Sequence, residues 1–159
     1  MPGSWPRPEL ASELPNLSDS NSRVTSRDTP RYNCIAWAAG EDFRNWWPDL
    51  MGIGYWPPSI PREEKMPAFV RAYETLNFRL CIGGVLENGI EKLALYGKRR
   101  GEDVIPTHAA LQLESGEWTS KLGRFEDISH ASVEDVYGPC YGEVIFYMAR
   151  PRNAVSPYP

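Results

Sequence analysis

The stretch "PTHAALQLESGEWTSKLG", residues 106–123, decides the predicted fold. Polar and apolar residues alternate on both sides of a Ser-Gly turn signal, which is typical of two antiparallel strands joined in a hairpin. His108 lies on the more polar face of the first strand. A three-residue loop at "SGE" places Ser120 on that same face, whereas a two-residue turn places Thr119 and Lys121 there.

Further strands are predicted on both sides of this hairpin. "FRLCI" and "IEKLALYGK" precede it, and "YGEVIFYMAR" follows it as an apolar, central strand. We interpret "GKRRGED" as a solvated loop, and "EDISHASVEDVYG" as a loop with at most one helical turn. Two helices come first: residues 34–39, capped by Asn33 and ended by Gly40, and an amphipathic helix within residues 62–77. The prediction is an α+β fold, with both helices packed on a four- to five-stranded antiparallel sheet.

The length and composition predict one domain with loosely packed ends. The chain has 159 residues, of which 42% are hydrophobic. Residues 1–30, rich in Pro, Ser and Asp, are predicted to form an N-terminal arm, residues 31–150 a single domain, and residues 151–159 a Pro-rich tail.

The charge pattern and the lack of long apolar runs limit the possible partners and location. The net charge is −4 and we find no basic footprint, so we predict that the chain binds no nucleic acid. We recognise neither a signal peptide nor an apolar run long enough for a membrane span, which predicts a cytoplasmic protein that does not bind membranes. Export by a secretion system that needs no signal peptide stays open.

Cys34 opens the first predicted helix, in "RYNCIAWAAG" at residues 31–40. The free N–H groups and partial positive charge of a helix start can stabilise a thiolate and a developing oxyanion. The alternative is a core thiol, since free cysteine is one of the most buried residue types. The three cysteines are widely spaced, and their spacing with the two histidines matches no zinc pattern. We therefore predict free thiols and no metal or other cofactor.

A nucleophilic cysteine needs a base, and the chain offers His108 and His130. We predict that His108 is the base, because the helix that begins with Cys34 can pack against the small residues beside it. Ser120 is predicted to orient the imidazole ring. Lys121 can only donate hydrogen bonds, so it cannot accept one from the ring N–H, and it is interpreted as a solvated charge. The alternatives to Ser120 are a backbone carbonyl, Gln112, Asp127 and His130.

This chain order is similar to that of papain-like cysteine enzymes, in particular the compact NlpC-type and CHAP-type cell-wall peptidases and amidases. The motifs "YNCIAWAAG", "WWP", "YWP", "THAALQL", "WTSKLG" and "YGEVIFYMAR" together also resemble an uncharacterised bacterial and fungal domain of unknown function, over about residues 24–150. The first resemblance implies a papain-like fold, with Cys34 as nucleophile and His108 as base. Ser120 departs from the His, Asn, Asp or Glu that those enzymes usually have in third place.

The predicted function is a cysteine-dependent hydrolase or acyl transferase that acts on an amide or thioester bond through an acyl-enzyme. The resemblance implies a peptide or peptidoglycan-like substrate. The residues predicted to bind it are Asn33, Trp37, Trp47 and Trp56. For the aromatic residues of the loop after the first helix, packing against the core is the alternative. A non-catalytic binding module on the same fold and a toxin-like effector domain also stay open.

Overall fold

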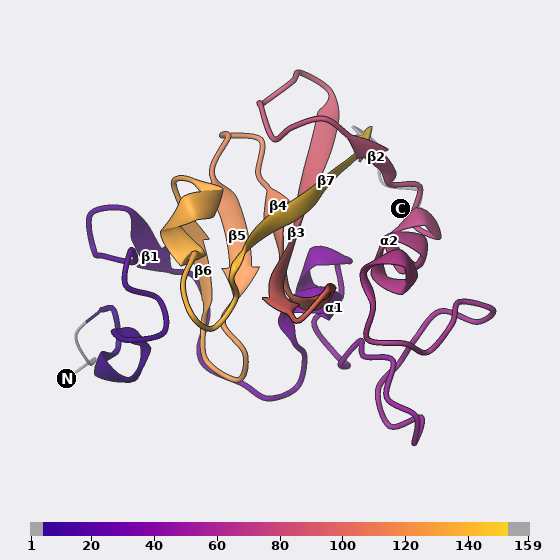
Figure 1. Ribbon diagram of the computed structural model, residues 1–159. Helices are drawn as coiled ribbons and strands as arrows, with labels where there is room; N and C mark the ends of the chain where they lie inside the picture. The colour runs from indigo at the N-terminus through magenta and orange to yellow at the C-terminus, as the bar shows by residue number, and fades with distance from the viewer. Residues whose placement is uncertain (1–4, 153–159) are drawn as a thin grey trace.

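A single seven-stranded antiparallel sheet with two short α-helices forms the fold in the computed structural model, which describes residues 5–152 (Figure 1). The strands lie in the order β1-β6-β5-β4-β3-β7-β2 across the sheet. The helices are α1 and α2, and η1 and η2 are 3-10 helices. In chain order the elements are η1 (Pro8–Leu10), β1 (Ser22–Val24), α1 (Cys34–Ala38), α2 (Met66–Glu74), β2 (Arg79–Cys81), β3 (Ile90–Arg100), β4 (Asp103–Gln112), β5 (Trp118–Lys121), β6 (Asp127–His130), η2 (Val133–Val136) and β7 (Glu143–Pro151).

The predicted papain-like α+β fold with four to five strands is therefore wrong. The difference lies in two short strands with few apolar residues, β1 and β6, which pair with each other so that Ser22 lies opposite His130. The "DISH" sequence of β6 contains one apolar residue, Ile128, and its composition suggested a loop. Strand β3 also continues through the basic residues 98–100, so the predicted solvated loop is the end of a strand and a tight turn.

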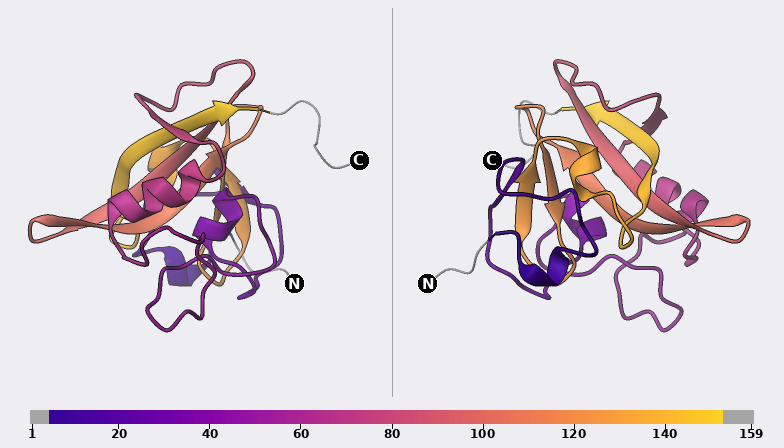
Figure 2. Two further views of the ribbon diagram at one scale, coloured as in Figure 1. Left: turned by 90° about the vertical axis from the view of Figure 1, so that its right-hand side faces the viewer. Right: turned by 60° about the vertical axis from the view of Figure 1, so that its left-hand side comes forward.

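The two faces of the sheet carry separate hydrophobic clusters, because successive residues of a strand point to opposite faces. Helices α1 and α2 cover one face, and the N-terminal segment and η2 cover the other (Figure 2). We call the first the helix-side core; its buried members include Cys34, Ile35, Phe69, Tyr73, Leu93, Leu95 and Ala109. We call the second the far-side core; its buried members include Leu10, Leu14, Leu17, Ala94, Tyr96, Ala110, Val133, Val136 and Tyr141.

The segment predicted to form an N-terminal arm is part of the folded domain over its described residues. Leu10, Leu14 and Leu17 are buried in the far-side core. The Trp5 indole N–H donates to the Ser22 hydroxyl at 2.9 Å, and Ser22 begins the edge strand β1. Of the predicted C-terminal tail, Pro151 ends β7, and residues 153–159 lie outside the described residues.

The hairpin register and the first helix follow the sequence closely. Gln112 of β4 lies opposite Trp118 of β5, which places Ser120 on the His108 face as the longer loop predicted. Helix α1 begins at Cys34 and is followed by Gly40, whose φ of 87° lies in the left-handed region that glycine adopts at helix ends. The sheet and α1 thus bring the histidine strand of the hairpin next to the helix start.

Candidate functional site

Helix α1 starts at Cys34 because Asn33 caps it, as the sequence predicts. The Asn33 Oδ1 accepts hydrogen bonds from the backbone N–H groups of Ala36, at 3.0 Å, and Trp46, at 3.1 Å. Its Nδ2 donates to the Trp46 carbonyl at 2.8 Å. Asn33 therefore fixes both the helix start and the aromatic loop that follows the helix.

The Cys34 thiol is buried against strand β4, with 8% of the residue exposed. Its Sγ lies 3.9 Å from the Thr107 carbonyl oxygen, and it is also close to the backbone N–H of Ala109. Burial raises the pKa of the thiol to about 11, and the nearby N–H groups oppose this only in part. The prediction that the helix start lowers this pKa is wrong. The loss of hydration disfavours the thiolate more than the start of a five-residue helix stabilises it.

The His108 side chain is fully buried on the other face of β4, opposite Tyr96. The imidazole stacks on the Tyr141 ring, with 4.0 Å between the ring centroids, and meets the Tyr96 ring edge-on. Its Nε2 is 2.9 Å from the Ser120 Oγ. The structure therefore forms the predicted contact between His108 and Ser120 across the hairpin.

The hydrogen-bonded chain continues beyond Ser120 to a second histidine. The Ser120 Oγ lies 2.8 Å from Nε2 of His130 on the neighbouring strand β6. The Nδ1 of His130 lies 2.8 Å from the Ser132 carbonyl oxygen. From the sequence, His130 is only an alternative to Ser120, and "DISH", with a single apolar residue, carries no signal that places it on an adjacent strand.

The other candidates for orienting His108 bind elsewhere. The Gln112 side-chain amide donates to the Gly84 carbonyl at 2.8 Å. The Asp127 carboxylate accepts a hydrogen bond of 2.7 Å from the Tyr32 hydroxyl. Among these residues, only Ser120 contacts the His108 ring.

Both histidines are neutral at pH 7 because burial disfavours their charged forms. Burial lowers the pKa of His108 well below its usual value, and the neighbouring His130 lowers it further. Burial also lowers the pKa of His130, where the Ser132 carbonyl and the carboxylates of Asp135 and Glu117 act in the opposite direction. A positive charge is thus less unfavourable on His130 than on His108.

The thiol and the imidazole lie on opposite faces of β4, so the helix that begins with Cys34 does not pack on the His108 face as predicted. Cys34 belongs to the helix-side core, while the His108 ring contacts the far-side core. The thiol contacts the strand on either side of His108, at the Thr107 carbonyl and the Ala109 N–H. Within residues 5–152, the buried Nδ1 of His108 has no hydrogen-bond partner. The structure therefore brings Cys34 beside the histidine strand and leaves the ring nitrogen free.

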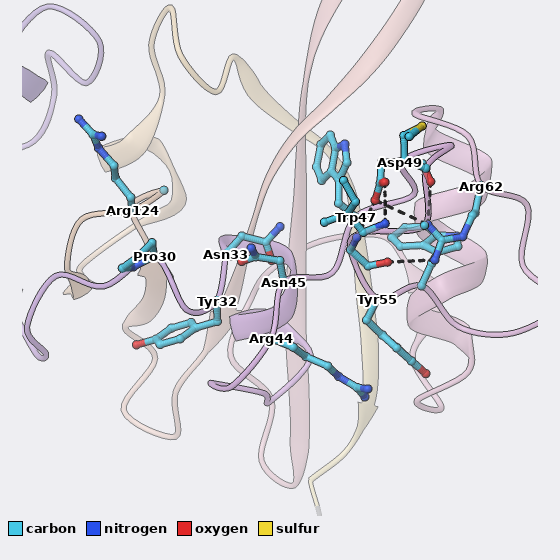
Figure 3. Close-up of a pocket in the computed structure, with 16 residues that line it drawn as sticks. Pro30, Tyr32, Asn33, Arg44, Asn45, Trp47, Asp49, Tyr55, Arg62 and Arg124 are labelled. Atoms are coloured by element: carbon cyan, nitrogen blue, oxygen red, sulfur yellow. Dashed lines mark hydrogen bonds and ion pairs between the residues drawn. The ribbon is translucent and has the colours of Figure 1, made fainter.

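An open groove of about 910 Å³ adjoins the start of α1. Tyr32 and Asn33, which directly precede Cys34, form part of its lining, and Trp47 and Trp56 come from the aromatic loop (Figure 3). Cys34 itself is not part of the lining. The groove is therefore next to the thiol in sequence and in space, and access to the sulfur requires a local movement.

Three of the four predicted substrate-binding residues, Asn33, Trp47 and Trp56, line this groove. The fourth, Trp37, does not; its indole N–H donates to the Thr119 hydroxyl at 2.9 Å, which fixes α1 on strand β5. Trp56 is only 4% exposed, so it serves mainly as core, as the packing alternative proposed.

Arginine side chains along the groove are mostly neutralised by neighbours. The Arg44 guanidinium lies 3.5 Å from the centre of the Tyr55 ring and pairs with Glu41 at 2.6 Å. Arg62 forms an ion pair with Asp49 at 3.7 Å and also donates to the backbone carbonyls of Asp49 and Gly54 (Figure 3). The groove thus offers aromatic and polar contacts with little net charge.

Lys121 occupies a buried position that sequence reasoning missed. The predicted solvated hairpin charge is wrong: the residue is 0% exposed. Its Nζ donates hydrogen bonds to the carbonyl oxygens of Thr29, at 2.8 Å, Gly123, at 2.6 Å, and Phe125. Lys121 therefore ties the segment that leads into α1 to the turn between β5 and β6.

No cluster of three or more His, Cys, Asp or Glu side chains suited to a metal ion occurs in residues 5–152. In the same residues, no helix is both long and apolar enough to span a membrane.

Comparison with known proteins gives one match, to a family model. The model described as "Domain of unknown function (DUF7689)" matches residues 23–149, which is most of the chain. No curated protein and no solved structure matches the chain. The chemistry of the site must therefore be argued from its own residues.

Proposed function

We propose a cysteine-dependent acyl-transfer function for this chain, which belongs to the DUF7689 family of domains of unknown function. In this proposal Cys34 is the nucleophile and His108 the base of a hydrolase or acyl transferase that acts on an amide or thioester bond. One observation carries it: among the described residues, the buried Nδ1 of His108 has no hydrogen-bond partner, and the Cys34 thiol rests against the same strand. A buried, unpaired ring nitrogen costs stability, and such costs are typical of functional sites.

The proposed reaction uses the Cys34 sulfur and the His108 nitrogen in turn. In a locally rearranged state that brings Sγ and Nδ1 within hydrogen-bonding distance, the thiol proton moves from Sγ to Nδ1 as the sulfur attacks the substrate carbonyl carbon, and the carbonyl electron pair moves onto oxygen. The Cys34 backbone N–H stabilises this oxyanion. When the C=O bond re-forms, the leaving group departs with the proton from the imidazolium. Water, or another nucleophile, then attacks the acyl-enzyme with the same nitrogen as base.

A second candidate, a non-catalytic binding module, is favoured by a different observation. The Cys34 thiol is buried and its pKa is raised to about 11, which suits a core residue more than a nucleophile. In that case the groove beside Tyr32 and Trp47 is the functional surface, and its aromatic rings bind a peptide-like ligand without turnover.

Iodoacetamide labelling separates these two functions, because the chain has three free cysteines of different exposure. Cys34 is buried, Cys81 is half-buried and Cys140 is exposed. Burial alone makes Cys34 the slowest of the three to react. If His108 takes the thiol proton, we expect Cys34 to react fastest at pH 7, and His108→Ala to slow it about 100-fold. Mass spectrometry of tryptic peptides over time measures all three rates in one sample.

The matched control is Ser129→Ala. Ser129 is a buried serine on β6 whose hydroxyl has no hydrogen-bond partner among the described residues, so its removal should leave all three rates unchanged. Slower labelling of Cys34 than of Cys140 in the unmodified protein would contradict the catalytic proposal and support the binding module.

A further inference from the structure

A chain of hydrogen bonds runs from His108 through Ser120 and His130 to the Ser132 carbonyl oxygen. That carbonyl determines which atom donates in each of them. A backbone carbonyl can only accept a hydrogen bond, so the His130 Nδ1 must carry the proton that it donates to the Ser132 oxygen. In a neutral imidazole only one nitrogen is protonated. His130 Nε2 therefore has a lone pair, and it accepts from the Ser120 hydroxyl.

The direction of these hydrogen bonds also fixes the tautomer of His108. The Ser120 hydroxyl proton points toward His130, so the Ser120 Oγ accepts from the Nε2–H of His108 at 2.9 Å. The neutral His108 ring then has its lone pair on Nδ1. This is the nitrogen that is buried without a partner and that the proposed reaction needs unprotonated.

We propose that Ser120 and His130 form a proton relay that keeps the Nδ1 of His108 unprotonated and accepts its excess charge during the reaction. The second part rests on the proposed function. When Nδ1 receives the Cys34 proton, the Nε2 proton of His108 moves to the Ser120 Oγ, and the Ser120 proton moves to the Nε2 of His130. His108 becomes neutral again, Ser120 keeps one proton, and His130 becomes the imidazolium.

The surroundings of the two rings favour this transfer. The His108 ring is enclosed by the aromatic rings of Tyr96 and Tyr141. His130 donates to a backbone carbonyl and lies near two carboxylates, Asp135 on η2 and Glu117 on the turn before β5. Of these, Glu117 also forms an ion pair with Arg23 of β1, at 3.6 Å. Ser120 and His130 are thus positioning residues, which act on the substrate only through His108.

Nitrogen-15 NMR of the imidazole rings tests the first part directly, because the chain has only two histidines. The rings are expected to be opposite tautomers at pH 7: His108 protonated at Nε2, and His130 protonated at Nδ1. A long-range ¹H–¹⁵N correlation spectrum distinguishes the protonated from the bare nitrogen in each ring. A spectrum in which His108 is protonated at Nδ1 would overturn the relay, whatever the reactivity of Cys34.

Two variants separate the effect of the relay on the His108 tautomer from the transfer of a proton to His130. In His130→Gln, the amide oxygen still accepts from Ser120 but cannot bind a proton. We expect the His108 tautomer to be retained and the Cys34 labelling rate to fall about tenfold. In Ser120→Ala the connection is lost, and we expect mixed His108 tautomers and the same slower labelling, with Ser129→Ala unchanged in both measurements.

These measurements also distinguish failure of the relay from failure of the proposed function. Opposite tautomers together with slow Cys34 labelling in the unmodified protein would support the positioning and reject the catalytic step. Fast Cys34 labelling that neither variant changes would reject the relay and leave Cys34 and His108 as the reacting pair.

Discussion

Replacing Lys121 with alanine is expected to lower the free energy of unfolding by about 3–5 kcal/mol, as the loss of a buried charged hydrogen-bonding group usually does. The Lys121 ammonium donates to three backbone carbonyls, from Thr29, Gly123 and Phe125. Without it, these carbonyls lose their partner and the space of the side chain is empty. Asp127 also loses a favourable positive neighbour. Urea denaturation followed by tryptophan fluorescence measures the change.

Lys98→Ala is the matched control for Lys121→Ala. Lys98 is also a strand lysine, in β3, but it is exposed to solvent. Its replacement should change the free energy of unfolding by less than about 0.5 kcal/mol. A loss below about 1 kcal/mol in Lys121→Ala would show that the three carbonyl contacts are not formed in solution.

Acid is expected to destabilise the fold well above the pH at which carboxylates titrate. The folded-state pKa values of His108 and His130 are lowered by burial, so the unfolded chain binds more protons below its histidine pKa of about 6.5. Stability therefore rises with pH in this range and is lost as pH falls. Each buried histidine contributes up to about 1.4 kcal/mol per pH unit, so the two together remove up to about 4 kcal/mol between pH 6.5 and 5.

Urea titrations at half-unit pH steps measure this loss, and His130→Gln provides the control. With only the His108 ring left to titrate, the free energy of unfolding should change with pH about half as steeply between pH 6.5 and 5 as in the unmodified protein. Asp127 acts in the opposite direction: burial raises its pKa, so its protonation favours the folded state as pH falls. A flat stability profile from pH 6.5 to 5.5 would contradict neutral, buried histidines.

Local signals in the sequence predicted the site better than the sheet. Asn33 has a strong preference for the cap position, and this alone places Cys34 at a helix start. The alternation around the turn left two registers open, and the structure has the one that places Ser120 on the His108 face, as the longer loop predicted.

The predictions that were wrong concern properties that depend on tertiary packing. Strands β1 and β6 are short and polar, and they exist because each pairs with a neighbour rather than because of their own propensity. Burial of Lys121 depends on the distant Thr29 carbonyl as well as on two carbonyls of the turn that follows β5, and no local pattern reveals the Thr29 contact. The raised pKa of Cys34 likewise comes from the elements that enclose it.

Strand β1 also has a practical consequence for fragments of this chain. The family match begins at residue 23, within β1. A fragment cut there would lack Leu10, Leu14 and Leu17, expose the apolar residues that they cover, and remove Ser22, which pairs with His130 at the edge of β6. Such a fragment is prone to self-association, so recombinant versions intended for assays should retain the first twenty-two residues.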